Sequence, residues 1–156
     1  MNGGMELYLH MPFCVRKCAY CDFLSFPTDQ ETQNLYTRRL REDIDAMGKK
    51  YGDIPVDTIF IGGGTPSVPD SALIVGIMEH VRKAFHVAEG AEISMEANPG
   101  TVTREKLTDY RRAGINRLSF GLQSANDREL KLLGRIHTWA EFLESFHLAR
   151  EGGFTN

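Results

Sequence analysis

Three cysteines are the residues of this chain whose type and spacing most clearly indicate chemistry. Cys14, Cys18 and Cys21 are the only cysteines among 156 residues, with three residues between the first pair and two between the second. They lie in one short stretch that also contains a proline and aromatic residues. Thiols at this spacing predict that all three share an inorganic partner.

Three partners would suit thiols at this spacing. A disulfide plus a free thiol has little support, because nothing before residue 10 resembles a signal peptide for an oxidising compartment. Structural zinc with His10 as fourth ligand is the second alternative, but zinc clamps usually draw their ligands as two separated pairs. A four-iron cluster on three thiolates is the third, and its open iron would bind a substrate or cofactor. We favour the cluster.

The spacing Cys-x3-Cys-x2-Cys, with an aromatic residue just before the last cysteine, resembles the radical S-adenosylmethionine (SAM) superfamily. A longer string is more specific: Tyr8-Leu9-His10-Met11-Pro12-Phe13-Cys14, followed by Cys21-Asp22-Phe23, is similar to the oxygen-independent coproporphyrinogen III oxidase family and its haem-chaperone branch. The resemblance implies that Cys14, Cys18 and Cys21 hold a [4Fe-4S] cluster and that SAM binds its fourth iron. Together these cofactors would generate a 5'-deoxyadenosyl radical.

The same resemblance implies a set of SAM-binding residues, most of which follow predicted strands: Tyr8, Tyr20, Gly63, Gly64, Thr65, Glu96, Gln123 and Arg135. Taken alone, these residues have plainer explanations. The glycines of Gly62-Gly63-Gly64-Thr65-Pro66 suit a tight turn. Glu96 could form a salt bridge, Arg135 could form a surface ion pair, and Tyr8 could lie in the core. We expect His10 to pack or hydrogen-bond near the cysteine loop without being a ligand, and His137 to be solvated.

Hydrophobic periodicity predicts strands alternating with helices along the whole chain. Capping boxes beginning at Thr28 and Thr138 mark the starts of two helices. In the first helix the predicted apolar stripe includes Ile44 and Met47, and in the last helix it includes Leu143 and Phe146. The expected strands span 5–10, 56–61, 91–97 and 116–120, and the expected helices span 28–51, 70–85, 103–113, 126–134 and 138–149.

Four strand–helix units in a row predict an α/β fold with a parallel sheet, either doubly wound or part of a β/α barrel. The resemblance selects the barrel: about four units of a radical SAM partial TIM barrel. The cysteine loop and the polar or glycine-rich stretches all follow strands. They should therefore meet at the carboxyl edge of the sheet, where ligands bind in both architectures.

The ends and the charge of the chain set the remaining expectations. The length and the resemblance together suggest that residues 1–156 are the N-terminal part of a radical SAM core domain, with the rest of the barrel and a C-terminal domain absent. A net charge of −3 and a pI near 5.9 give no footprint for nucleic acid. No apolar run approaches the ~20 residues of a membrane span, so we expect a cytoplasmic protein.

The function expected from the resemblance depends on one position. The oxidases of the family carry a further cysteine two residues after the last cluster ligand, where this chain has Phe23. This difference favours a haem chaperone that binds and transfers haem. The alternative is an oxygen-independent coproporphyrinogen III oxidase, which forms protoporphyrinogen IX by oxidative decarboxylation. The implied partners are haem or a porphyrinogen, a reductant protein such as flavodoxin or ferredoxin, and a haem-acceptor protein.

Overall fold

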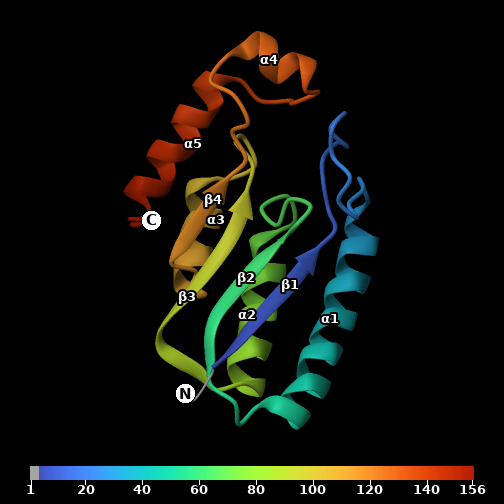
Figure 1. The fold of residues 1–156 in the computed structure, drawn as a ribbon, viewed down its shortest axis with the longest axis vertical. Coiled ribbons are helices and arrows are strands. Elements are labelled where there is room, and N and C mark those ends of the chain that lie inside the picture. The colour runs from blue at the N-terminus through green and yellow to red at the C-terminus, as the bar shows by residue number, and fades with distance from the viewer. Residues whose placement is uncertain (1–3) are drawn as a thin grey trace.

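A computed structural model describes residues 4–156. Four parallel strands form one sheet in the order β1-β2-β3-β4 (Figure 1). The predicted alternation of strands and helices is confirmed, although β3 starts four residues earlier than the pattern indicated. The elements are β1 (Met5–Met11), α1 (Gln30–Tyr51), β2 (Val56–Gly63), α2 (Ser71–Ala84), β3 (Val87–Ala97), α3 (Arg104–Arg112), β4 (Arg117–Phe120), α4 (Asp127–Leu132) and α5 (Trp139–Glu151).

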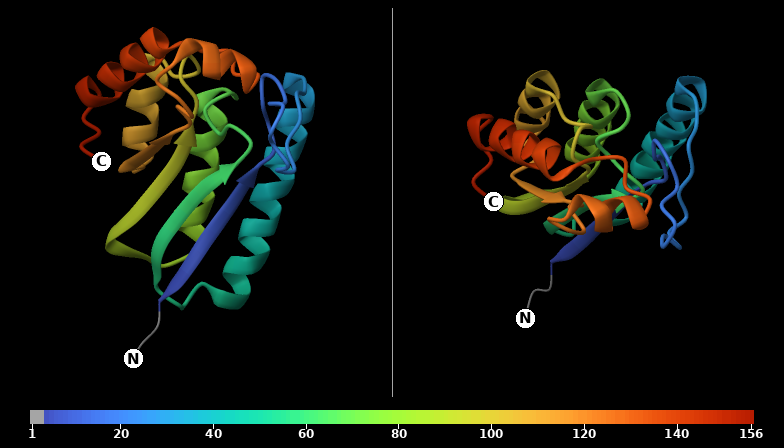
Figure 2. Two further views of the ribbon diagram at one scale, coloured as in Figure 1. Left: turned by 45° about the horizontal axis from the view of Figure 1, so that its top comes forward. Right: turned by 90° about the horizontal axis from the view of Figure 1, so that it is seen from above.

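The core lies between the sheet and helices α1, α2 and α3, which cover one face (Figure 2). Side chains alternate along the strands, so that Leu9, Ile59 and Ile93 are buried under these helices. On the opposite face, Tyr8 and Glu92 are exposed, and residues 4–156 place no layer of helices over it. A doubly wound sheet would carry helices on both faces, so the arrangement is that of a partial barrel.

Helix α1 differs from the prediction at two points. Its N-cap is Asp29, whose side chain accepts a hydrogen bond from the Thr32 backbone N–H, and not Thr28. Met47 was assigned to the buried stripe but is exposed. Gly48 faces α2 instead, where an added Cβ would lie 2.5 Å from the Cβ of Ala84. The two helices approach so closely that this position requires a glycine.

Helix α5 starts where the sequence predicted, but part of the face that was predicted to be buried is exposed. Thr138 and Glu141 form the expected capping box. Phe142 packs edge-on against Phe120 of β4, but Leu143 and Phe146 are exposed. The short strand β4, with four residues, gives the helix little sheet surface to cover.

The carboxyl ends of all four strands lie at one edge, as predicted (Figure 1). The cysteine loop, the Gly62–Pro66 turn and the loops after β3 and β4 all emerge there. None of the helices within residues 4–156 has the length and apolar character needed to cross a membrane.

Candidate functional site

A cavity of about 330 Å³ lies at this edge. It is enclosed by the cysteine loop, the Gly62–Pro66 turn and the loops that follow β3, β4 and α4. Ten of the eleven predicted site residues line it, and Tyr8 does not. Those ten are Cys14, Cys18, Tyr20, Cys21, Gly63, Gly64, Thr65, Glu96, Gln123 and Arg135.

The base of the cysteine loop is closed by a short parallel bridge. Phe13 and Phe26 pair, with the Cys14 N–H donating to the Phe26 carbonyl at 3.2 Å and the Phe26 N–H to the Pro12 carbonyl at 2.9 Å. The Phe13 ring is buried in the core, where it packs edge-on against the Tyr36 ring with 5.3 Å between the ring centroids. The core thus anchors the residue immediately before the first thiol.

Lys17 holds the rest of the loop together. Its ammonium donates hydrogen bonds to the carbonyl of Phe23, to the carbonyl of Ser25 at 3.3 Å and to the Ser25 hydroxyl at 3.5 Å. These acceptors lie beyond the last cysteine, so the Lys17 side chain ties the middle of the three-cysteine segment to the residues that follow it. The loop needs such a tie because it has no regular secondary structure of its own.

The three thiols are free and partly buried. In the described part of the chain, no three His, Cys, Asp or Glu side chains are gathered as they would be around one metal ion. The thiols instead line one cavity together.

The Gly62–Pro66 turn is pressed against the start of the cysteine loop. The Gly64 N–H donates to the Met11 carbonyl at 2.8 Å and the Thr65 N–H to the Phe13 carbonyl at 2.6 Å. A Cβ on Gly64 would lie 2.6 Å from the Phe13 oxygen. Gly63 has a φ of +114°, and a Cβ there would meet the His10 ring at 2.4 Å. Neighbouring atoms therefore leave no room for a side chain at either position. At Gly63 the positive φ also favours glycine.

Glu96, at the end of β3, reaches across to this turn. Its Oε2 accepts a hydrogen bond from the Gly63 N–H at 2.9 Å. Among residues 4–156 it forms no salt bridge, so the ion pair considered for it is not found. The carboxylate faces the cavity and supports the glycine turn at the same time.

Arg135 is half-buried among the loops and is not in a surface ion pair. Its Nη2 donates to Asn98 Oδ1 and to the Gly121 carbonyl, both at 2.7 Å, and its Nη1 lies 3.5 Å from Cys18 Sγ. Gln123, on the same side of the cavity, has a φ of +70°, which is uncommon for a residue with a side chain. Both residues come from loops whose conformation is set by contacts within the site.

Two residues that sequence reasoning did not assign belong to the same network. Asn98 joins Thr65 and Arg135, and its position directly after a strand was the available signal. His137 is 5% exposed, so its predicted solvation is wrong. It contacts the Leu122 carbonyl through Nε2 at 3.2 Å and Arg135 through Nδ1 at 3.4 Å. Burial, and then the charge of Arg135, lowers the pKa of His137.

Tyr8 lies beside the cavity, on the uncovered face of the sheet, and is 59% exposed. Its hydroxyl is 3.0 Å from His10 Nδ1, and His10 Nε2 is 2.9 Å from the Leu24 carbonyl. His10 therefore hydrogen-bonds the cysteine loop, as expected. Partial burial, and then the charge of Glu96, raises the pKa of Tyr8. A SAM contact of Tyr8 stays a prediction.

Comparison with known proteins decides the family. The family model described as the radical SAM superfamily matches residues 8–156. This chain belongs to the radical SAM superfamily. Membership implies a [4Fe-4S] cluster and SAM as cofactors.

Several relatives and solved structures resemble this radical SAM chain. It is 45% identical to "Heme chaperone HemW" of Escherichia coli over 85% of the chain and 35% of that protein. It is 40% identical to "Heme chaperone HemW" of Haemophilus influenzae over 96% of the chain and 40% of that protein. The structure of E. coli coproporphyrinogen III oxidase (HemN), a radical SAM enzyme, superposes with a TM-score of 0.90 at 30% identity, over 99% of the chain and 36% of that enzyme. The chain thus spans well under half the length of these proteins.

The residues present suit the cofactors that the superfamily implies. Thiolates are the protein ligands of iron–sulfur clusters, and three of them share this cavity. Arg135 and Lys17, which also line it, supply positive charge toward an anionic group. Gly63 and Gly64 line the same cavity without side chains of their own.

Proposed function

We propose that this chain forms the cluster- and SAM-binding part of a haem chaperone, which binds haem and transfers it to an acceptor protein. The observation that carries the proposal is Phe23, at the position where the family's oxidases have an additional cysteine. Phe23 lies at the same cavity as the three thiols. The identity of 45% and 40% with two proteins named heme chaperone HemW supports the same choice.

In this proposal each side of the cavity has its own task. Cys14, Cys18 and Cys21 would hold the cluster, which in its reduced form supplies the electron for SAM cleavage. Gly63 and Gly64 would let the methionine part of SAM approach the backbone. The polar side chains opposite would orient the rest of SAM: Thr65, Glu96, Gln123 and Arg135, with Tyr20 and Tyr8 as aromatic neighbours.

The arrangement of charge fits these tasks. Arg135 contributes the positive charge of its guanidinium to the cavity near Gly121, where it would attract a carboxylate. Glu96, near the end of β3, presents a carboxylate to the amino or hydroxyl groups of a ligand. A zwitterionic amino acid moiety, such as that of SAM, therefore meets a complementary charge at each end.

The alternative function is oxygen-independent coproporphyrinogen III oxidation to protoporphyrinogen IX. The likeness to E. coli coproporphyrinogen III oxidase, with a TM-score of 0.90 and 30% identity, favours this alternative. In both functions a reductant protein such as flavodoxin or ferredoxin would deliver electrons. We further propose that residues 1–156 are the N-terminal part of the core domain in a longer protein.

Two assays on the full-length protein separate the functions. In the first, the reconstituted protein is incubated with coproporphyrinogen III, SAM and a reductant, and porphyrins are separated by chromatography. In the second, the haem-loaded protein is mixed with a haem-free acceptor, and the absorbance of the acceptor is followed. Haem transfer without protoporphyrinogen IX supports the chaperone. Multiple-turnover formation of protoporphyrinogen IX contradicts it, and a Cys18→Ser variant serves as the cluster-deficient control.

A further inference from the structure

A chain of hydrogen bonds connects two of the three thiols through Asn98. Cys14 Sγ lies 3.6 Å from Thr65 Oγ1, which accepts from Asn98 Nδ2 at 2.9 Å. Asn98 Oδ1 in turn accepts from Arg135 Nη2 at 2.7 Å, and Arg135 Nη1 lies 3.5 Å from Cys18 Sγ. Asn98 is the central member of this chain. In residues 4–156, Cys21 has no comparable side-chain hydrogen bond to its sulfur.

Chemistry fixes the direction of the two bonds that the Asn98 side chain makes in this chain. A guanidinium only donates, so the oxygen of the Asn98 amide must face Arg135. The amide nitrogen must then face Thr65 and donate to its hydroxyl oxygen. The Thr65 hydroxyl keeps its proton and can donate it to Cys14 Sγ when that sulfur is a thiolate, which only accepts. Both ends of the chain therefore present a donor to a sulfur atom.

Asn98 is held in place by its backbone as well as by its side chain. Its N–H donates to Ser67 Oγ at 3.2 Å, and its carbonyl accepts from Thr101 Oγ1 at 2.7 Å. Ser67 is fully buried, and Lys106 donates to the Ser67 carbonyl at 2.8 Å. Because its backbone N–H and carbonyl are both held, Asn98 can orient the hydrogen bonds of its side chain to Thr65 and Arg135.

We propose that Asn98 is a positioning residue that directs hydrogen bonds onto the sulfur atoms of Cys14 and Cys18. Hydrogen bonds to cluster sulfurs and nearby positive charge favour the reduced cluster, because they offset its added negative charge. Asn98 thereby raises the reduction potential of the cluster that these cysteines hold. This inference rests on the proposed cluster site.

Asn98→Asp tests the inference with almost no change in shape. Both oxygens of a carboxylate accept, so the Thr65 hydroxyl must donate to residue 98 and turn its proton away from Cys14. The bond to Arg135 is kept as an ion pair, and a negative charge is added. We expect reduction of the cluster to become at least about tenfold less favourable, which is a fall of about 59 mV in the potential of a one-electron couple.

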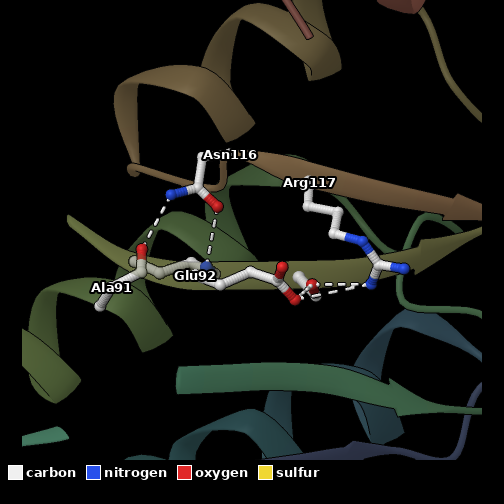
Figure 3. A network of polar contacts seen from close by, with 6 residues as sticks. Ala91, Glu92, Asn116 and Arg117 are labelled. Carbon is white, nitrogen blue, oxygen red and sulfur yellow. Dashed lines mark hydrogen bonds and ion pairs between the residues drawn. The ribbon is translucent and has the colours of Figure 1, made fainter. Parts of the chain in front are cut away.

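The matched control is Asn116→Asp. Asn116 also bridges with its amide: Nδ2 donates to the Ala91 carbonyl at 2.8 Å, and Oδ1 accepts from the Ile93 N–H at 2.8 Å (Figure 3). It lies before β4, at the end of the sheet opposite the thiols. The same substitution there should lower stability through the lost bond to Ala91 and leave the potential unchanged.

The experiment is an EPR-monitored redox titration of the full-length protein after anaerobic reconstitution, with iron content measured for each variant. A lower potential in Asn98→Asp and an unchanged one in Asn116→Asp support the inference. Equal potentials in the wild type and Asn98→Asp, or equal shifts in both variants, overturn it. If Asn98→Asp takes up no cluster, two variants of Thr65 test the inference instead. The reduction potential of the cluster must fall in Thr65→Val, which lacks the hydroxyl, and stay at the wild-type value in Thr65→Ser, which keeps it. A wild-type protein without a cluster refutes the proposed function itself.

Discussion

Gly64→Ala tests whether the glycine turn must touch the cysteine loop. The added Cβ would lie 2.6 Å from the Phe13 carbonyl oxygen and 2.8 Å from that of Met11. Both obstacles are backbone atoms of a buried segment, so neither can rotate away. The turn has to move off the loop, and the hydrogen bonds from the Gly64 and Thr65 N–H groups are lost.

The cost of this change follows from its parts. Two backbone hydrogen bonds contribute about 1 kcal/mol each, and crowding in a packed region costs about 1–3 kcal/mol. We therefore expect Gly64→Ala to lower the free energy of unfolding by about 3–5 kcal/mol. Gly90→Ala is the control, because Gly90 has a φ of +79° and nothing within 4 Å of an added Cβ. Backbone strain alone should cost about 1–2 kcal/mol there.

Urea unfolding of the full-length apoprotein, followed by circular dichroism, compares the two variants. Iron content after reconstitution then shows whether the displaced turn also impairs the site, which Gly90→Ala should leave intact. A Gly64→Ala variant that loses no more stability than Gly90→Ala would refute the claim that contact between turn and loop is tight.

Three further predictions concern single side chains. Lys17→Met removes the ammonium that ties Phe23 and Ser25 to the cysteine segment, so the cluster should be lost several-fold faster to a chelator; a wild-type rate contradicts this. Tyr110→Phe should raise the free energy of unfolding by about 1 kcal/mol, because the buried Tyr110 hydroxyl has no partner within residues 4–156; a loss measured by urea unfolding contradicts it. Burial and Arg135 lower the pKa of His137, so the unfolded state takes up its proton more readily, and this residue subtracts stability as the pH falls below about 6.5. His137→Gln should flatten the pH dependence of the unfolding free energy between about pH 7 and 5, and an unchanged slope contradicts it.

The sequence predicted those features of the site that depend on local signals. Three closely spaced cysteines, a glycine turn after a strand and polar residues at strand ends each lie within a few residues of one another. Parallel connectivity then brings them to one edge. Glu96 was singled out by its place at the end of a strand and Arg135 by the family resemblance, and both line the cavity.

Features that depend on contacts distant in sequence were missed. The partners of Asn98 are Thr65 and Arg135, which lie on other loops, so its central place was not visible in its own surroundings. His137 was expected in solvent because it directly precedes a predicted helix cap, yet the loop folds it inward. Met47 lost its buried position to Gly48 because the distance between α1 and α2, and not the periodicity of α1, decides which residue fits.

The most direct test of the account is anaerobic iron and sulfide analysis of the reconstituted full-length protein, with EPR spectra of the reduced protein before and after SAM is added. We expect about four irons per chain, held by three thiolates with one iron open, and a signal that changes when SAM binds. Stoichiometric zinc without a cluster, or a cluster signal that saturating SAM leaves unchanged, would contradict it.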